Sequence, residues 1–207
     1  MPTPRIEIKG ILEGCRSNGA VPRVHGNGFI QLDVPWNKHV RVNIWGHPDI
    51  PCQDSPSPIH DHRFGFISKI YKGVMTNHNL VYSHLHHAPT HQVYNPVCRE
   101  GEDTILVPEN QSYVADKQID LLVGKTQQFS QSYVPGETYE MRPFEFHETG
   151  VCEPTITVIQ KFPVTVEYDS RKAQVLVPIG AEPDNKFTRD NTTAEELWRI
   201  IQETLKA

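Results

Sequence analysis

Hydrophobic and polar residues alternate with a period of two along much of this chain. This alternation is typical of half-buried β-strands, because successive side chains of a strand point to opposite faces of the sheet. It predicts strands at Val40–Trp45 and Thr155–Lys161, and a pair of strands within residues 66–82 that is interrupted at Lys72 and Gly73. Shorter runs predict further strands near residues 105–107, 121–123, 131–134 and 139–143.

Turn-forming residues divide the chain into segments that suit strands better than long helices. The 17 prolines and 13 glycines are spread along the sequence, and two long loops are expected at residues 48–58 and 100–111. Many short strands at this spacing favour an all-β fold of the antiparallel barrel or jelly-roll type.

One segment near the C-terminus has a helical period instead. Its apolar residues recur three or four positions apart, at Leu197, Ile200, Ile201 and Leu205. Thr193 and Glu196 precede this run with the spacing of a capping box, in which each side chain binds the backbone N–H of the other residue. We expect one amphipathic helix that packs on the β domain.

The composition indicates which binding partners and which cellular compartment to expect for this protein. The net charge of the 207-residue chain is −5, and it contains no basic run, so nucleic acid and anionic membrane surfaces are not expected partners. No apolar stretch is long enough to span a membrane, and the N-terminal residues lack the apolar region of a signal peptide. We therefore expect a cytoplasmic protein, in which free buried thiols are favoured over disulfides for Cys15, Cys52, Cys98 and Cys152.

Histidines carry the strongest chemical signal. Seven of the eleven lie between His60 and His91. His60 and His62 are two positions apart at the start of an apolar run, so on a strand both imidazoles would point to one face, with Cα atoms roughly 6.5 Å apart. Both rings could then reach one metal ion at about 2.0–2.1 Å, while Asp61 would point the other way.

These residues resemble the first motif of the cupin superfamily, in which two histidines flank one residue and a glycine follows at the distance of Gly73. Phe66 occupies the position where many cupins carry a glutamate ligand. The segment from Pro143 to His147 resembles the second cupin motif. The interval between His62 and His147 is longer than in compact cupins, and an inserted hairpin at residues 83–112 would account for it.

The resemblance implies a cupin-type double-stranded β-helix at residues 38–165. Residues 1–37 would form an N-terminal extension that adds strands to this barrel, and residues 166–207 a C-terminal extension ending in the helix. It also implies a three-histidine metal site at His60, His62 and His147, as in the thiol dioxygenase branch. Such a neutral site leaves open coordination positions and suits Fe(II), with Zn(II) or Mn(II) as alternatives.

Other polar residues are candidates for catalysis. If the chain stays extended, Glu145 shares the face of His147 and could be a general base or a fourth ligand. His78 could point into the site from the strand after Gly73. Lys161 or Gln160 could meet an anionic substrate group at the end of the last strand. For each, the alternative is a solvated or structural side chain.

A second histidine cluster competes with the first. His84, His86 and His87, followed by His91, lie among turn-forming residues, which is typical of a solvated loop at the tip of a hairpin. Such a loop could also contribute one ligand or a substrate contact.

These observations together predict a metal-dependent cupin enzyme that oxidises a small molecule in the manner of Fe(II) dioxygenases. Within enzymes, the alternative is a hydrolase or isomerase that uses Zn(II) or Mn(II) as a Lewis acid. Outside enzymes, the alternative is a binding module without catalytic activity. The protein could also form a homodimer, because cupin barrels often pair through their sheets.

Overall fold

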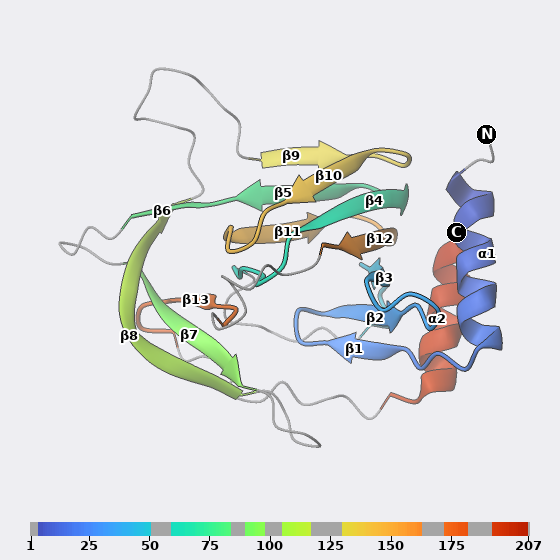
Figure 1. The fold of residues 1–207 in the computed structure, drawn as a ribbon, viewed down its shortest axis with the longest axis horizontal. Helices are drawn as coiled ribbons and strands as arrows, with labels where there is room; N and C mark the ends of the chain where they lie inside the picture. Colours follow the sequence, from blue (N-terminus) through green and yellow to red (C-terminus); the bar gives the residue numbers. More distant parts are fainter. Residues whose placement is uncertain are drawn as a thin grey trace.

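The computed structural model describes residues 4–50, 59–83, 90–97, 105–116, 130–162, 172–181 and 192–206. Within these ranges the chain forms two helices and thirteen strands (Figure 1). They are α1 Pro4–Ser17, β1 Arg23–His25, β2 Phe29–Asp33, β3 Val40–Trp45, β4 Phe66–Lys72, β5 Met75–Asn79, β6 Val81–Ser83, β7 His91–Val97, β8 Ile105–Asp116, β9 Ser130–Tyr133, β10 Thr138–Met141, β11 His147–Val151, β12 Thr155–Lys161, β13 Val175–Pro178 and α2 Ala194–Lys206.

The largest sheet has the strand order β1-β2-β3-β12-β4-β10. All of its pairs are antiparallel. The predicted strands at Val40–Trp45 and Thr155–Lys161 are confirmed as β3 and β12. β12 lies in the interior of the sheet, and its first three residues, Thr155, Ile156 and Thr157, are all buried. Their β-branched side chains suit a strand that is covered on both faces.

The remaining strands form a second layer. β11, β5 and β9 make a three-stranded sheet, and β13, β7, β8 and β6 make a four-stranded one. His60 joins them, because it forms antiparallel bridges with His147 of β11 and with Val175 of β13. The predicted break between β4 and β5 occurs at Gly73, which has a φ of 72°. The predicted run at residues 121–123 lies outside the described residues.

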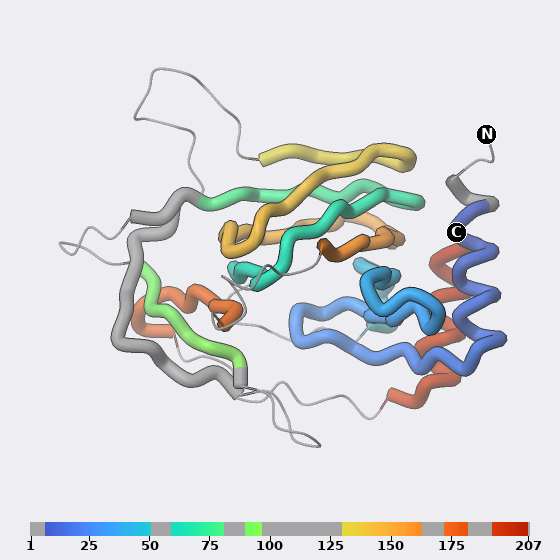
Figure 2. The backbone as a smooth tube through the Cα atoms, in the orientation of Figure 1, coloured from blue at the N-terminus to red at the C-terminus, as the bar shows by residue number. Residues whose placement is uncertain are grey.

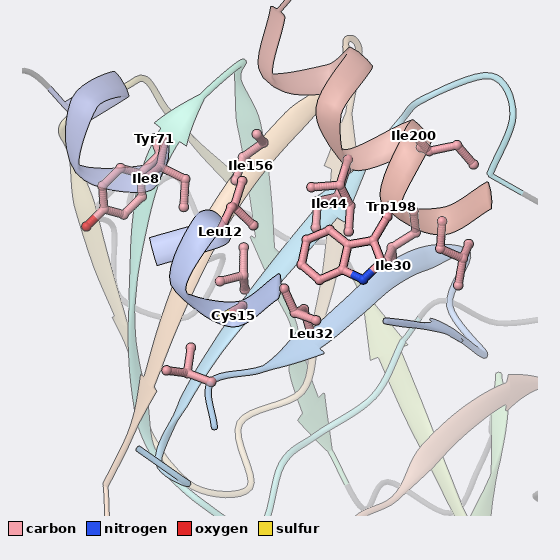
Figure 3. Close-up of a cluster of buried hydrophobic side chains, with 14 of the residues drawn as sticks. Ile8, Leu12, Cys15, Ile30, Leu32, Ile44, Tyr71, Ile156, Trp198 and Ile200 are labelled. Atoms are coloured by element: carbon pink, nitrogen blue, oxygen red, sulfur yellow. The ribbon is translucent and has the colours of Figure 1, made fainter. Parts of the chain in front are cut away.

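Alternating residues give the six-stranded sheet two different faces. The outer face, with Ile30, Leu32, Val42, Ile44 and Ile156, forms a continuous apolar core with the two helices (Figure 3). The inner face contributes Phe66, Ile70, Tyr139 and Met141 to a second core, which also contains Met75 of β5. The second core therefore lies between the two layers of strands.

The C-terminal helix is confirmed as α2, and its capping box is formed. Glu196 N donates to Thr193 Oγ1, and Thr193 N donates to Glu196 Oε2. The N-terminal helix α1 was not predicted from the sequence. It lies beside α2 (Figure 2). Between the two helices, Arg16 pairs with Glu195 at 3.5 Å and lies over the ring of Trp198.

The structure is thus β-rich with two helices, and the expected β class is confirmed at that level. β1 and β2 extend the sheet from the N-terminal side. In the described part of the chain, no helix is long and apolar enough to cross a membrane. Cys15 is a free buried thiol as expected, whereas Cys152 is free but exposed, because it lies in the turn before β12; Cys52 and Cys98 lie outside the described residues.

Candidate metal centre

Backbone pairing sets His60 against His147. His60 N donates to His147 O at 3.0 Å, and His147 N donates to His60 O at 2.9 Å. The neighbouring Ile59 O accepts a hydrogen bond from Leu176 N. The segment with Ile59 and His60 is therefore held between β11 and β13. His60 and His147 face each other as a cross-strand pair.

A tight turn holds His62 in place. Phe144 N donates to His62 O at 2.7 Å, and Phe144 is the non-glycine residue with a positive φ, 63°, in the described part of the chain. This left-handed conformation is uncommon for a bulky residue and is retained where the surrounding structure stabilises it. The ring of Phe66 packs edge-on against His62, with centroids 5.2 Å apart.

The three predicted ligands come together. Each of His60, His62 and His147 offers a ring nitrogen, and these nitrogens all lie within 4.8 Å of one another. His62 Nε2 and His147 Nε2 are 3.1 Å apart. Two nitrogens that each bind one ion at about 2.0–2.1 Å lie about 2.9–3.4 Å apart for octahedral to tetrahedral angles. The observed separation fits shared coordination of a transition metal.

Asn77 of β5 determines which ring nitrogen of His147 carries the proton. Asn77 Oδ1 lies 2.7 Å from His147 Nδ1, and Asn77 Nδ2 donates to Asn79 Oδ1 at 2.6 Å. An amide oxygen can only accept, so His147 Nδ1 carries the proton and His147 Nε2 presents its lone pair to the cluster. Such a hydrogen bond on the non-ligating nitrogen orients a metal-binding imidazole and raises its basicity.

Two rings of the cluster, those of His62 and His147, favour the neutral form, which is the form that binds metal. Burial holds the pKa of His62 well below its usual value, and it is lowered further because a positive charge on His60, His147, His25 or Arg41 would repel a protonated His62 ring. Burial also holds the pKa of His147 well below the usual range, with His60 as the second cause. His60 and His62 are only partly buried, so the cluster can be reached from solvent.

Carboxylates are absent from this cluster among the described residues. Phe66 is buried and packs against both His62 and His147. Asp61 turns away from the rings as expected, and its Oδ1 accepts a hydrogen bond from Gln174 N at 2.6 Å. Any ion held here would therefore be bound by neutral nitrogen donors.

Two of the predicted catalytic residues lie elsewhere. The left-handed turn at Phe144 interrupts the extended chain that would place Glu145 beside His147, and the Glu145 carboxylate instead accepts the N–H of Arg142 at 3.0 Å. His78 alternates with Asn77 on β5, so it faces away from His147, and its Nδ1 lies 2.6 Å from Ser130 Oγ. These two placements correct the expectation that both side chains point into the site.

Of the other residues predicted for the site, one lies next to the histidine cluster and one lies apart from it. Lys161 Nζ lies 5.1 Å from the ring centre of Phe64, and that ring packs against His62 at 5.3 Å. Lys161 therefore remains next to the cluster. His91 lies on β7, where its Nδ1 contacts Thr90 Oγ1 at 2.8 Å, and it does not belong to the cluster. Residues 84, 86 and 87 lie outside the described ranges.

Several nearby residues were missed by the sequence reasoning. Asn77 holds His147, and Asn27 Nδ2 lies 3.4 Å from His60 Nδ1. Burial, followed by the charge of His60 and the arginines of β1 and β3, lowers the pKa of His25 to about 3. The alternation of Val40–Trp45 could have placed Arg41 on the polar face of its strand, but it carried no information on which residues that face would meet.

In comparisons with known proteins, no family model matches this sequence and no curated protein is significantly similar to it. The structure defines a β-rich protein with a cluster of three histidines at metal-binding distance. The functional argument that follows is therefore built on this cluster and on the side chains around it.

Proposed function

We propose that His60, His62 and His147 hold a divalent transition metal ion, and that the protein is a cupin-type metalloenzyme acting on a small molecule. The observation that carries this proposal is the convergence of the three ring nitrogens, two of them 3.1 Å apart. The Asn77 contact supports it, because it turns the lone pair of His147 Nε2 toward the other two rings.

The donor set favours a particular group of metals. Three imidazoles without a carboxylate suit Fe(II) or Zn(II), and the resemblance to three-histidine cupins favours Fe(II), with Zn(II) or Mn(II) as alternatives. When bound, such an ion would supply redox chemistry in the first case and Lewis-acid activation in the others. Oxidation of a small molecule is therefore the preferred reaction, and hydrolysis or isomerisation is the alternative.

The chain's own residues would prepare the site. Asn77 holds the proton on His147 Nδ1, so the ligating nitrogen needs no deprotonation before metal binding. Phe64 and Phe66 pack on the ring of His62 and give that part of the site an apolar wall. The partial exposure of His60 and His62 leaves a side from which a substrate can approach.

Metal analysis tests the proposal directly. The wild-type protein, purified without a histidine tag and reconstituted anaerobically with Fe(II), should retain about one equivalent of metal after desalting. His62→Ala should retain little, because it removes one of three ligands. His78→Ala is the matched control, since that histidine lies on the opposite face of β5 and should leave the metal content unchanged. Less than about 0.2 equivalents in the wild type would refute a metal site.

A second measurement separates an enzyme from a binding module. Oxygen uptake by the Fe(II)-loaded protein is measured with pools of small carboxylic acids, amines and thiols, with product detection by mass spectrometry. Uptake that depends on one pool and disappears in His62→Ala supports the oxidative reaction. Metal binding without turnover of any pool would favour the binding module. Light scattering after gel filtration tests the proposed homodimer.

A further inference from the structure

Three cationic side chains gather at one end of the inner face of the six-stranded sheet. Among the described residues, Arg23 of β1, Arg41 of β3 and Lys161 of β12 share this region with one carboxylate, that of Asp33. Asp33 binds both arginines, with Oδ2 2.7 Å from Arg23 Nη2 and Oδ1 3.1 Å from Arg41 Nε. This group of side chains therefore carries three positive charges and one negative charge.

Lys161 is the cation that Asp33 does not pair with directly, although the charge of that carboxylate still acts on it. Its ammonium lies over the ring of Phe64, and among the described residues it has no carboxylate partner. It is partly buried, and burial together with the nearby Arg41 lowers its pKa to about 8. A partly desolvated ammonium that faces other cations is stabilised when an anion binds beside it.

This cationic group adjoins the histidine cluster. The centre of the Phe64 ring lies 5.1 Å from Lys161 Nζ and 5.3 Å from the centre of the His62 ring. The charge of Arg41 also acts on His62 and on His25. On the same face, Phe29 stacks on Trp45 with ring centres 3.9 Å apart, and His25 stacks on Phe29 at 4.3 Å. Aromatic surface thus lies beside both the cations and the histidines.

We propose that Lys161 and Arg41 bind the carboxylate group of an organic acid and hold the acid against the aromatic side chains beside the histidines. Calling this acid the substrate rests on the function proposed above, whereas carboxylate binding itself does not require the metal. Arg41 donates from Nε to Asp33, its two Nη groups make no hydrogen bond to the side chains that the structure describes, and Lys161 adds a point charge.

The donor set favours a carboxylate over a phosphate. Phosphate sites commonly use several backbone N–H groups at a helix N-terminus. Both helices of the described chain cover the outer face of the sheet, so neither presents its N-terminus to this group. One ammonium and one partly engaged guanidinium match the two oxygens of a carboxylate.

Calorimetric titration of the chelator-treated protein with benzoate tests the proposal. At pH 6.5 the wild type should bind benzoate at least about tenfold more tightly than benzamide, its neutral counterpart, and more tightly than phosphate. Lys161→Met should weaken benzoate binding about tenfold or more, and Lys161→Arg should largely retain it. Lys9→Met is the matched control, because Lys9 forms an exposed pair with Glu13 on α1, away from the inner face, and this variant should bind benzoate as the wild type does.

The outcomes separate the two proposals. Equal affinity for benzoate and benzamide, or unchanged benzoate binding in Lys161→Met, would overturn the carboxylate subsite even if the protein loads metal. Tighter binding of phosphate than of benzoate would also overturn it. Benzoate binding that depends on Lys161, in a protein that fails to retain metal after reconstitution with Fe(II), would support the subsite and refute the metal centre. If Lys161→Met fails to fold, the comparison of benzoate with benzamide on the wild type still decides.

Discussion

Replacement of Asn77 by leucine removes the acceptor that holds His147. The side chain of Asn77 is 3% exposed, and its Oδ1 lies 2.7 Å from His147 Nδ1. Leucine has a similar volume but cannot accept a hydrogen bond. The variant therefore leaves a buried N–H without a partner, because His147 is itself 3% exposed.

The structure sets the size of the effect. A buried donor left unsatisfied costs about 1–3 kcal/mol. The second bond of Asn77, to Asn79 Oδ1, adds little, because Asn79 is only partly buried and water can replace the amide. We expect the free energy of unfolding to fall by about 2 kcal/mol, and metal affinity to fall about 10–100-fold because the ring loses its fixed tautomer.

Urea unfolding followed by tryptophan fluorescence measures the first effect on chelator-treated protein, and titration with Co(II) or Zn(II) measures the second. Asn43→Leu is the matched control. Asn43 is also buried on the inner face, but its Oδ1 accepts no hydrogen bond from the described residues, so leucine should be neutral or stabilising there. A loss below about 0.5 kcal/mol in Asn77→Leu, with metal affinity unchanged, would refute the assigned role of Asn77.

Two further predictions concern stability. His25, His62 and His147 have a pKa below the ordinary value of 6.5 in the folded protein, so below pH 6.5 the unfolded chain binds more protons and stability falls as the pH falls. Each histidine should cost up to about 2 kcal/mol between pH 7.5 and pH 5, measured by urea unfolding at a series of pH values, and a flat profile would contradict their neutral state. Gly73→Ala should destabilise the protein by more than about 1 kcal/mol, because the φ of Gly73 is positive and a Cβ there would lie 2.7 Å from Pro154 O. An unchanged midpoint of thermal unfolding would contradict this close approach between the end of β4 and the start of β12.

The strands were the most predictable part of the fold. β3 and β12 have the predicted bounds, because Val42 and Ile44 of β3 and Ile156 of β12 are buried in the same apolar core. Helix α1 was missed although its apolar residues have helical spacing. Gly10 and Gly14 lower its intrinsic helix propensity, and burial of its apolar side chains against the sheet stabilises it in the folded protein.

The site was predictable in its ligands but not in its surroundings. A histidine pair two residues apart is visible in any strand, and the structure brings His147 to it. The placement of Glu145 was wrong because a positive φ at Phe144 cannot be foreseen for a residue other than glycine. His78 was misplaced because the alternation of β5 does not reveal which of its faces meets the histidines.

The sequence by itself determined the β class, the C-terminal helix with its capping box, and the pairing of His60 with His62 on one strand face; His147 was added to this pair only through the resemblance to the second cupin motif. These features depend on short-range periodicity and spacing, which a chain carries locally. Only the tertiary structure decided that Asn77, 70 positions away from His147, holds its ring, and that Arg41 and Lys161 lie beside the same cluster. Those contacts depend on which strands are neighbours and in which register, and alternation within a single strand specifies neither.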